Sequence, residues 1–190
     1  MVACVEQVLV VSSSEKGRTF LTQLLKSAAI AQTVTAQSGS EARRMLAQSD
    51  FALVVVNAPL SDEYGHELCT QIADTSPAGI LLLAKSEIAD DISARLEPYG
   101  VFVLAKPLSK TLFFQALRLA QASRRRMLGL QRENVKLQAK IEEIRLCDRA
   151  KCALIQYLSM TEAQAHRYIE KQAMDLRLSR REIAENILKT

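Results

Sequence analysis

Seven basic side chains lie within 33 residues near the C-terminal end of this 190-residue sequence. Lysine and arginine grouped in this way bind phosphate, because each neutralises one phosphate charge. Arg167 and Lys171 are spaced as neighbours on one helix face, and two arginines begin a predicted helix, where backbone amides also attract phosphate. The group indicates a polyanion-binding surface. It consists of Arg149, Lys151, Arg167, Lys171, Arg177, Arg180 and Arg181.

Two tyrosines, Tyr157 and Tyr168, accompany these basic residues. An exposed ring here could stack on an unpaired base, since proteins read RNA mainly through the unpaired bases of loops. Both rings fall on apolar helix faces, however, so the pattern favours packing in the core over base contact. Tyr168 nevertheless joins the basic residues as a candidate RNA-binding residue.

No residue pattern in the sequence indicates catalysis. Paired carboxylates, a nucleophile beside a base and a phosphate-binding loop are all missing. His66 and His166 are the only histidines that could assist a metal or a nucleophile, and the four cysteines lack CxxC spacing. We therefore predict reduced thiols, with no metal and no cofactor. The cysteines are Cys4, Cys69, Cys147 and Cys152.

The composition is that of a globular chain, with 48% hydrophobic and 24% charged residues. No apolar stretch reaches the length of a membrane span, and the first residues lack the features of a secretory leader, so we expect a cytoplasmic protein. The charge is uneven. Residues 1–108 hold 8 basic and 12 acidic residues, whereas residues 109–190 hold 17 and 9. This asymmetry places the expected contact with a polyanion in the second half of the chain.

Five short strand patterns, most of them apolar, alternate with helical patterns over the first 120 residues or so. Such alternation predicts an α/β fold, a doubly wound five-stranded parallel sheet, with any ligand at the carboxyl ends of the strands. Ser38 and Glu41 form a capping-box pattern at the start of one helix, which continues to Gln48. The predicted strands cover residues 7–11, 33–36, 51–56, 80–84 and 101–105.

Residues 1–122 resemble the receiver domain of bacterial two-component response regulators. The segment Asn57-Ala58-Pro59-Leu60, followed by Gly65, matches the surroundings of the phosphate-accepting aspartate of receivers. Lys106-Pro107, after the fifth strand, matches the receiver's Lys-Pro pair, whose peptide bond is typically cis. The resemblance implies a receiver fold for this part of the chain.

The residues that do receiver chemistry are replaced here. Ser12 and Ser13 stand where the resemblance places Mg²⁺-binding acids, Asn57 stands for the nucleophilic aspartate, and Ala84 stands for the conserved hydroxyl. Only Lys106 is kept, and we expect it to pair with nearby strand-end groups. A neutral amide cannot attack a phosphoryl donor, and a hard dication prefers anionic oxygens. We therefore predict a degenerate phosphorylation site in a pseudo-receiver that is controlled by a partner protein or a ligand.

A long helix is predicted to start at Ser109 and to reach about Leu146, with apolar residues at heptad spacing. Outside this stripe the helix is polar beyond Arg124, so we expect a coiled coil with a second copy of the chain. Asn134 in the seam supports a dimer, because a seam amide is best satisfied by its copy across the axis. An intramolecular hairpin is the alternative. The seam begins with Phe113, Ala116 and Ala120 and continues through the dimerisation residues Met127, Leu130, Asn134, Leu137, Ile141 and Ile144.

Three short helices are predicted after Leu146, covering residues 148–158, 162–176 and 180–188. The last two begin at capping boxes, Thr161 with Gln164 and Ser179 with Glu182. The expected inward residues are Ala150, Ala153, Leu154, Tyr157 and Leu158 in the first, Ala165, Tyr168, Ile169 and Ala173 in the second, and Ile183, Ala184, Ile187 and Leu188 in the third.

The segment from Cys147 to Leu188 resembles the ANTAR domain, an RNA-binding module of antitermination regulators. The matching residues are Arg149-Ala150-Lys151 with Leu154, Thr161 to Ala165, Ala173-Met174 with Arg177, and Ile183-Ala184 with Ile187. The resemblance implies a dimer that binds paired hairpins in a leader transcript and prevents a terminator from forming.

We therefore expect three parts: a pseudo-receiver at 1–122, a coiled-coil linker at 123–146 and an ANTAR domain at 147–190. The expected function is RNA-binding transcription antitermination, with homodimerisation through the coiled coil and no enzymatic activity. Two alternatives stay open: a DNA-binding response-regulator-like transcription factor, in which the last helices form a helix-turn-helix, or a protein-interaction adaptor whose basic surface meets an acidic protein.

Overall fold

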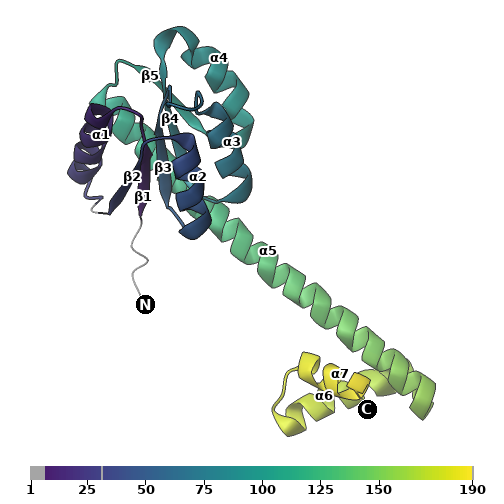
Figure 1. Cartoon of the computed structure of the whole chain (residues 1–190). Coiled ribbons are helices and arrows are strands. Elements are labelled where there is room, and N and C mark those ends of the chain that lie inside the picture. Colours follow the sequence, from purple (N-terminus) through teal and green to yellow (C-terminus); the bar gives the residue numbers. More distant parts are fainter. Residues whose placement is uncertain (1–6, 31, 190) are drawn as a thin grey trace. The chain divides into compact units, whose positions relative to one another are not determined.

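The computed structural model describes residues 7–30 and 32–189. The chain forms two compact units, residues 1–129 and residues 130–190. Cys4 lies outside the described residues. The first unit is an α/β domain, and the second consists of helices only (Figure 1). None of the described helices carries an apolar stretch long enough to cross a membrane.

The first unit is built on a parallel five-stranded sheet with the order β2-β1-β3-β4-β5 (Figure 1). The register aligns Val11 with Ala36 and with Val56, so the central strands end at the same edge of the sheet. This confirms the predicted fold class, and the predicted strand bounds agree with the structure to within two residues. The strands are β1 (Val8–Val11), β2 (Thr33–Ala36), β3 (Leu53–Asn57), β4 (Gly79–Lys85) and β5 (Phe102–Lys106).

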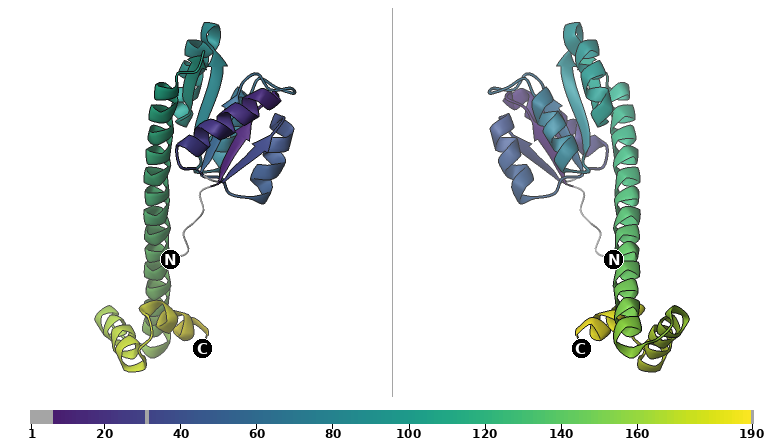
Figure 2. Two further views of the ribbon diagram at one scale, coloured as in Figure 1. Left: turned by 90° about the vertical axis from the view of Figure 1, so that its left-hand side faces the viewer. Right: turned by 90° about the vertical axis from the view of Figure 1, so that its right-hand side faces the viewer.

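Helices cover both faces of this sheet, which explains why the central strands are apolar throughout (Figure 2). On one face, Val8 and Val10 pack with α1 (Glu15–Ser27) and with the first turns of α5 (Lys110–Leu158). On the other face, alternate strand residues such as Leu9 and Val11 pack with the remaining helices. These are α2 (Gly39–Gln48), α3 (His66–Thr75) and α4 (Ser86–Leu96), and a short turn η1 (Glu97–Tyr99) precedes β5.

The three predicted N-terminal caps, at α2, α6 (Glu162–Leu176) and α7 (Arg180–Lys189), are present, but one hydrogen bond of the α2 cap differs from the prediction. At α2 the Ser38 hydroxyl accepts from the Glu41 amide at 3.1 Å. The Glu41 carboxylate, however, accepts from the Gln37 amide at 2.7 Å, so the predicted return bond to Ser38 is wrong. Both halves of the capping box are present at α6 and at α7.

The 49-residue helix α5 is continuous from Lys110 to Leu158. The predicted separate helix at 148–158 is therefore wrong, because no proline or glycine interrupts the chain there and Ala150 and Leu154 continue an apolar stripe. The alternative of an intramolecular hairpin is wrong as well, since α5 runs on as one helix and the described helices leave the seam exposed. The apolar seam residues are each 49–56% exposed, and they are Met127, Leu130, Leu137, Ile141 and Ile144.

The first heptad positions of the predicted seam have another role. Phe113, Ala116 and Ala120 are buried in the core of the first unit, against the sheet and α1. They cannot face a second helix at the same time. The row that is open to a partner therefore begins at Met127, beyond the end of this core.

The second unit packs α6 and α7 around the end of α5. Three of its six buried residues are alanines, whose side chains are small. The core is correspondingly compact, and Ala153 lies at its border, half-buried. The buried residues are Ala150, Leu154, Ala165, Ile169, Ile183 and Ala184, with Ala173, Ile187 and Leu188 partly buried beside them.

Candidate functional site

Ser12 and Asn57 meet at the carboxyl edge of the sheet, after β1 and at the end of β3. The Asn57 side-chain amide donates to the Ser12 hydroxyl at 2.9 Å. That hydroxyl donates in turn to the Ser14 carbonyl at 3.3 Å, and Ser12 is fully buried. A Cβ atom at Gly17 would lie 2.7 Å from both polar groups, so the first turn of α1 lies against them. Ser12 and Asn57 thus form a neutral hydrogen-bonded pair.

The loop after β1 is held by Arg18 and Ser13. The Arg18 guanidinium donates to the Ser12 carbonyl at 2.7 Å and to the Ser13 carbonyl at 3.1 Å. The Ser13 hydroxyl donates to the Pro59 carbonyl at 3.3 Å and so contacts the segment after β3. Ser12 and Ser13 therefore both act as structural hydrogen-bonding residues here.

Lys106 closes the same edge of the sheet from β5. Its ammonium group donates to the Ala58 carbonyl, which is the expected contact with a strand-end group. Burial, together with the neighbouring charge of Lys85, lowers the pKa of Lys106. Ala84 is fully buried and brings no polar group to the site. The Lys106–Pro107 peptide bond is cis, as the resemblance implied, and so is Ala58–Pro59.

The donor set at this edge does not fit Mg²⁺. The side chains here offer neutral oxygens only, from Ser12, Ser13 and Asn57. The Ser12 hydroxyl is already hydrogen-bonded to the Asn57 amide, and the Ser13 hydroxyl to the Pro59 carbonyl. A hard dication prefers carboxylates. Among the described residues, no three histidine, cysteine, aspartate or glutamate side chains converge on a common point that could hold a metal. The described cysteines, Cys69, Cys147 and Cys152, are free thiols.

The loop that joins β3 to α3 is fastened to α2 by two carboxylates. Asp62 accepts from the backbone amides of Gly39 and Ser40, both at 2.9 Å, and from the Ser40 hydroxyl at 2.8 Å. These bonds hold the pKa of Asp62 well below its usual range. Glu63 forms two parallel bonds with the Arg43 guanidinium, at 2.6 and 2.8 Å.

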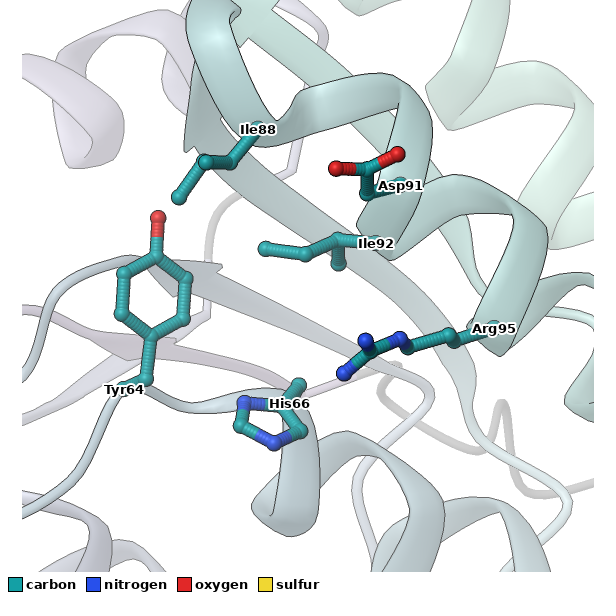
Figure 3. Close-up of a pocket in the computed structure, with 6 residues that line it drawn as sticks. All are labelled: Tyr64, His66, Ile88, Asp91, Ile92 and Arg95. Atoms are coloured by element: carbon teal, nitrogen blue, oxygen red, sulfur yellow. The ribbon is translucent and has the colours of Figure 1, made fainter.

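A cavity of about 220 Å³ lies beside this loop, between Tyr64, the start of α3 and α4 (Figure 3). Tyr64 and Ile92 give it an apolar wall, and the Tyr64 ring lies 6.0 Å from the His66 ring. Figure 3 shows the Arg95 side chain extending from α4 toward His66. The hollow offers both apolar and charged groups to a small ligand or to a side chain of a partner.

In the second unit, several of the predicted RNA-binding residues are engaged within the chain. The Lys151 ammonium lies 2.8 Å from Asp148 and 3.6 Å from Glu162, and its side chain is only 19% exposed. These carboxylates raise the pKa of Lys151. Arg180 pairs with Glu143 at 3.5 Å. Lys151 and Arg180 line one cavity of about 180 Å³.

Arg181 forms ion pairs through its side chain, whereas Arg177 contacts the end of α6 through its backbone amide. Arg181 pairs with Glu185 at 3.0 Å, and its guanidinium lies 3.9 Å from Glu142. Arg177 ends α6 in the left-handed region, at φ 54°, and its amide donates to the carbonyls of the last turn. Its side chain is exposed.

Three other predicted residues are exposed, and the structure shows no ion pair between them and any described residue: Arg149, Arg167 and Lys171. Arg167 and Lys171 lie one turn apart on α6, as predicted. A phosphate can reach these three cations, and the exposed Arg177, without breaking an ion pair with a described residue.

The expected burial of Tyr157, Leu158 and Tyr168 is wrong. Tyr157 is 78% exposed, Leu158 is 59% exposed and Tyr168 is 38% exposed. The core of this unit is small, and these three side chains lie outside it. The structure instead places both tyrosines on one cavity of about 580 Å³, a grouping that helix periodicity could not reveal. The other lining residues are Ala153, Leu154, Leu158, Ile187 and Leu188.

Comparison with known proteins assigns the two units. The model of the response regulator receiver domain matches residues 8–118, which is more than half of the chain. The chain belongs to the response regulator receiver family. A second model, that of the ANTAR domain, matches residues 135–188. The receiver domain is thus followed by an ANTAR domain, as the two resemblances implied, and both families are regulatory and not catalytic.

A relative of similar length supports the same order of domains. The transcriptional regulatory protein PdtaR of Mycobacterium tuberculosis, in strains CDC 1551 / Oshkosh and ATCC 25618 / H37Rv, is 26% identical over 184 residues. The match covers 97% of this chain and 90% of the relative. Together with the two families, this relative supports a transcription regulator.

Solved receiver domains share the fold of the first unit. The signal receiver domain of an HD domain-containing protein from Pseudomonas fluorescens Pf-5 matches with a TM-score of 0.59 and 24% identity, over 68% of this chain and 96% of that one. A response regulator receiver domain protein from Clostridium thermocellum matches with a TM-score of 0.57 and 17% identity, over 65% and 98%. At these identities the likeness concerns the fold alone.

Proposed function

We propose that this chain is an RNA-binding transcription antiterminator. As a dimer it binds paired stem–loops in a leader transcript through its ANTAR domain and keeps a terminator hairpin from forming, so that RNA polymerase continues. One observation carries the proposal: the helical unit that matches the ANTAR domain exposes two tyrosines, and it also exposes cations that have no ion-pair partner among the described residues.

The exposed cations of α6 are suited to the phosphate backbone. Arg167 and Lys171 can each neutralise one phosphate and release its counterion, so binding should weaken as salt is raised. Lys151 and Arg180 already contact carboxylates, and a phosphate would have to replace those partners. Sequence preference would come from unpaired loop bases, which proteins read through stacking and edge contacts.

The receiver domain acts in this proposal as a pseudo-receiver. Its strand-end site holds a neutral Asn57–Ser12 pair and has no carboxylate to bind a metal, so phosphorylation cannot provide the signal. Control comes from a partner protein or a ligand that binds this domain. The cavity beside Tyr64 and Arg95 is a surface on which such binding can act.

The dimer is proposed to form through the exposed row of α5. Met127, Leu137 and Ile141 are about half exposed, as the seam of a two-stranded coiled coil is before it pairs. Asn134 lies in the same row and favours two strands by pairing with its own copy. Two ANTAR domains joined in this way match two stem–loops on one transcript.

The test is the affinity of the unphosphorylated full-length chain for a tandem stem–loop RNA from the leader transcript of its own operon, over a salt series. Replacing Arg167 or Lys171 with Ala should weaken binding and reduce the slope of log K against log salt by about 1 each. Arg44→Ala is the matched control, because Arg44 is an exposed arginine of the receiver domain. It should bind RNA as the wild type does.

Three outcomes would contradict the proposal. Tighter binding to a duplex DNA of equal length than to the RNA would favour the DNA-binding transcription factor. Weak RNA binding with little salt dependence would favour the adaptor. If the folded full-length dimer binds no RNA, residues 123–190 alone should be tested, and failure there as well would end the antiterminator hypothesis.

A further inference from the structure

The cavity that Tyr157 and Tyr168 line is the largest open hollow described above, and none of the proposals so far gives it a ligand. Tyr157 comes from the last turn of α5 and Tyr168 from the middle of α6, while Ile187 and Leu188 of α7 form part of the lining. All of these residues belong to the unit that matches the ANTAR domain. The cavity can therefore be considered without reference to the receiver domain.

Both rings are free to contact a ligand. Tyr157 is 78% exposed and Tyr168 is 38% exposed. The structure shows no hydrogen bond from either hydroxyl to a described residue, and no stacking of these two rings on each other or on another described ring. Exposed aromatic residues without partners above an apolar floor cost free energy in water, and they are characteristic of binding surfaces.

The volume and charge of the cavity indicate the class of ligand. About 580 Å³ is within the range of small-molecule sites, which are mostly apolar with a few polar groups. No acidic residue is part of the lining. Along the three helices, Arg149 precedes Ala153 by one turn, Lys171 follows Tyr168 by three residues, and Lys189 directly follows Leu188. Basic residues thus lie close in sequence to the lining residues of all three helices. An apolar, aromatic hollow with no acidic residue in its lining suits a flat base attached to a phosphate backbone.

We propose that this cavity receives one unpaired base from an RNA loop, which stacks on the rings of Tyr157 and Tyr168. The inference rests on the proposed RNA-binding function and adds to it the site where a loop base is held. Arg149 and Lys171 contact the phosphates on either side of that base. The apolar floor accepts the face of any base, and the two hydroxyls are available to its polar edge.

A second copy of the chain is a less suitable occupant. Seven residues line the cavity, whereas a stable protein interface uses about 20–30 residues on each side. The long exposed row of α5 already provides a surface of the kind that a second copy needs. The cavity has instead the dimensions of a pocket for one group.

The test uses the full-length chain and the tandem stem–loop RNA of the preceding section. Tyr157→Ala and Tyr168→Ala should each lower the affinity by between about 5-fold and 150-fold, the loss that follows from removing one base-stacking contact. Tyr168→Phe keeps the ring and should retain most of the affinity. Tyr99→Ala is the matched control, because Tyr99 is an exposed tyrosine of the receiver domain, 45% accessible, and should bind as the wild type does.

The base is identified by replacing each loop nucleotide in turn with an abasic one. At one loop position, removing the base should lower the affinity of the RNA for the wild type. Removing the same base should leave the affinity for Tyr168→Ala unchanged. This loss of effect shows that the ring and the base act through the same contact. Circular dichroism and thermal unfolding confirm that each variant is folded.

The inference fails if the folded tyrosine variants bind the RNA as the wild type does, or if every abasic position weakens wild type and variant equally. It also fails if Tyr157→Ala lowers self-association in sedimentation experiments and leaves RNA affinity unchanged, because the pocket would then hold a second copy. In these cases the wild type still binds RNA and the proposed function stands. Absence of RNA binding by the folded wild type would overturn both.

Discussion

Replacing Leu137 with Ala in the exposed row of α5 should weaken dimerisation of the chain about 100-fold. Leu137 is 56% exposed, so about half of its side chain remains to be buried when a second helix pairs with this row. The substitution removes three carbon atoms, and each buried methylene contributes about 0.8 kcal/mol. The loss is about 1.3 kcal/mol per chain and about 2.7 kcal/mol per dimer, which corresponds to the 100-fold change.

Val135→Ala is the matched control for this substitution. Val135 is 64% exposed on the same helix, but it lies at a position next to Asn134 that faces away from the seam of a coiled coil. Its truncation should leave the dimer dissociation constant unchanged. Sedimentation equilibrium over a range of concentrations measures the dissociation constants, and circular dichroism checks that both variants keep the helix.

The proposed pairing is refuted if Leu137→Ala and Val135→Ala weaken association equally, or if the wild type stays monomeric at the highest concentration tested. Asn134→Leu gives a second check on the geometry. Removing the seam amide should strengthen association and broaden the range of oligomers formed, because that amide favours two strands at a cost in stability. A variant that becomes purely monomeric would contradict the assignment of Asn134 to the seam.

Three further predictions concern the receiver domain and α5. Neither the wild type nor Asn57→Asp should gain a phosphoryl group from acetyl phosphate and Mg²⁺ in intact-mass measurements, because one new carboxylate does not supply a metal site. The pKa of Asp62 is lowered on folding, so the contribution of this carboxylate to the stability of the fold is complete above about pH 4 and is lost as the pH falls below that. The urea midpoint of Asp62→Asn should therefore fall less steeply in acid than that of the wild type. Gly129→Ala should stabilise the chain by about 0.5–1 kcal/mol, since no atom lies within 4 Å of the added Cβ, whereas Gly17→Ala should destabilise it, since the Cβ would lie 2.7 Å from the Asn57 amide.

The fold of the receiver domain could be predicted because four of its five strands are short apolar runs between turn signals, and the fifth, Thr33–Ala36, is rich in β-branched residues. The central strands are buried on both faces, so their sequences have no polar alternation that could be mistaken for a helix face. The caps at Thr161 and Ser179 were likewise predictable, because each depends on residues three apart in the sequence. Local chemistry was sufficient in these cases.

Predictions about which helix face is covered were less accurate, since they depend on tertiary distances. The heptad from Phe113 to Ile144 is regular along the sequence, yet its first positions pack in the receiver core and its later positions are exposed. Near the C-terminus, three of the six buried residues are alanines, and Tyr157 lies outside the small core that these residues form. The carboxylate partners of Lys151 could not be foreseen either, because Glu162 lies on another helix.

The replacement of the carboxylates at the strand-end site by neutral residues supports a different form of control. Phosphorylation acts as a switch because it adds charge at a place where cations can respond. Here Ser12 is fully buried, and its hydroxyl accepts a hydrogen bond from the Asn57 amide and donates one to the Ser14 carbonyl. A carboxylate at Ser12 would be buried without a metal partner at a high cost in free energy, so a single acidic substitution cannot restore the switch. For this reason we place control of the receiver domain in binding, and a phosphoryl adduct on Asn57→Asp would refute that view.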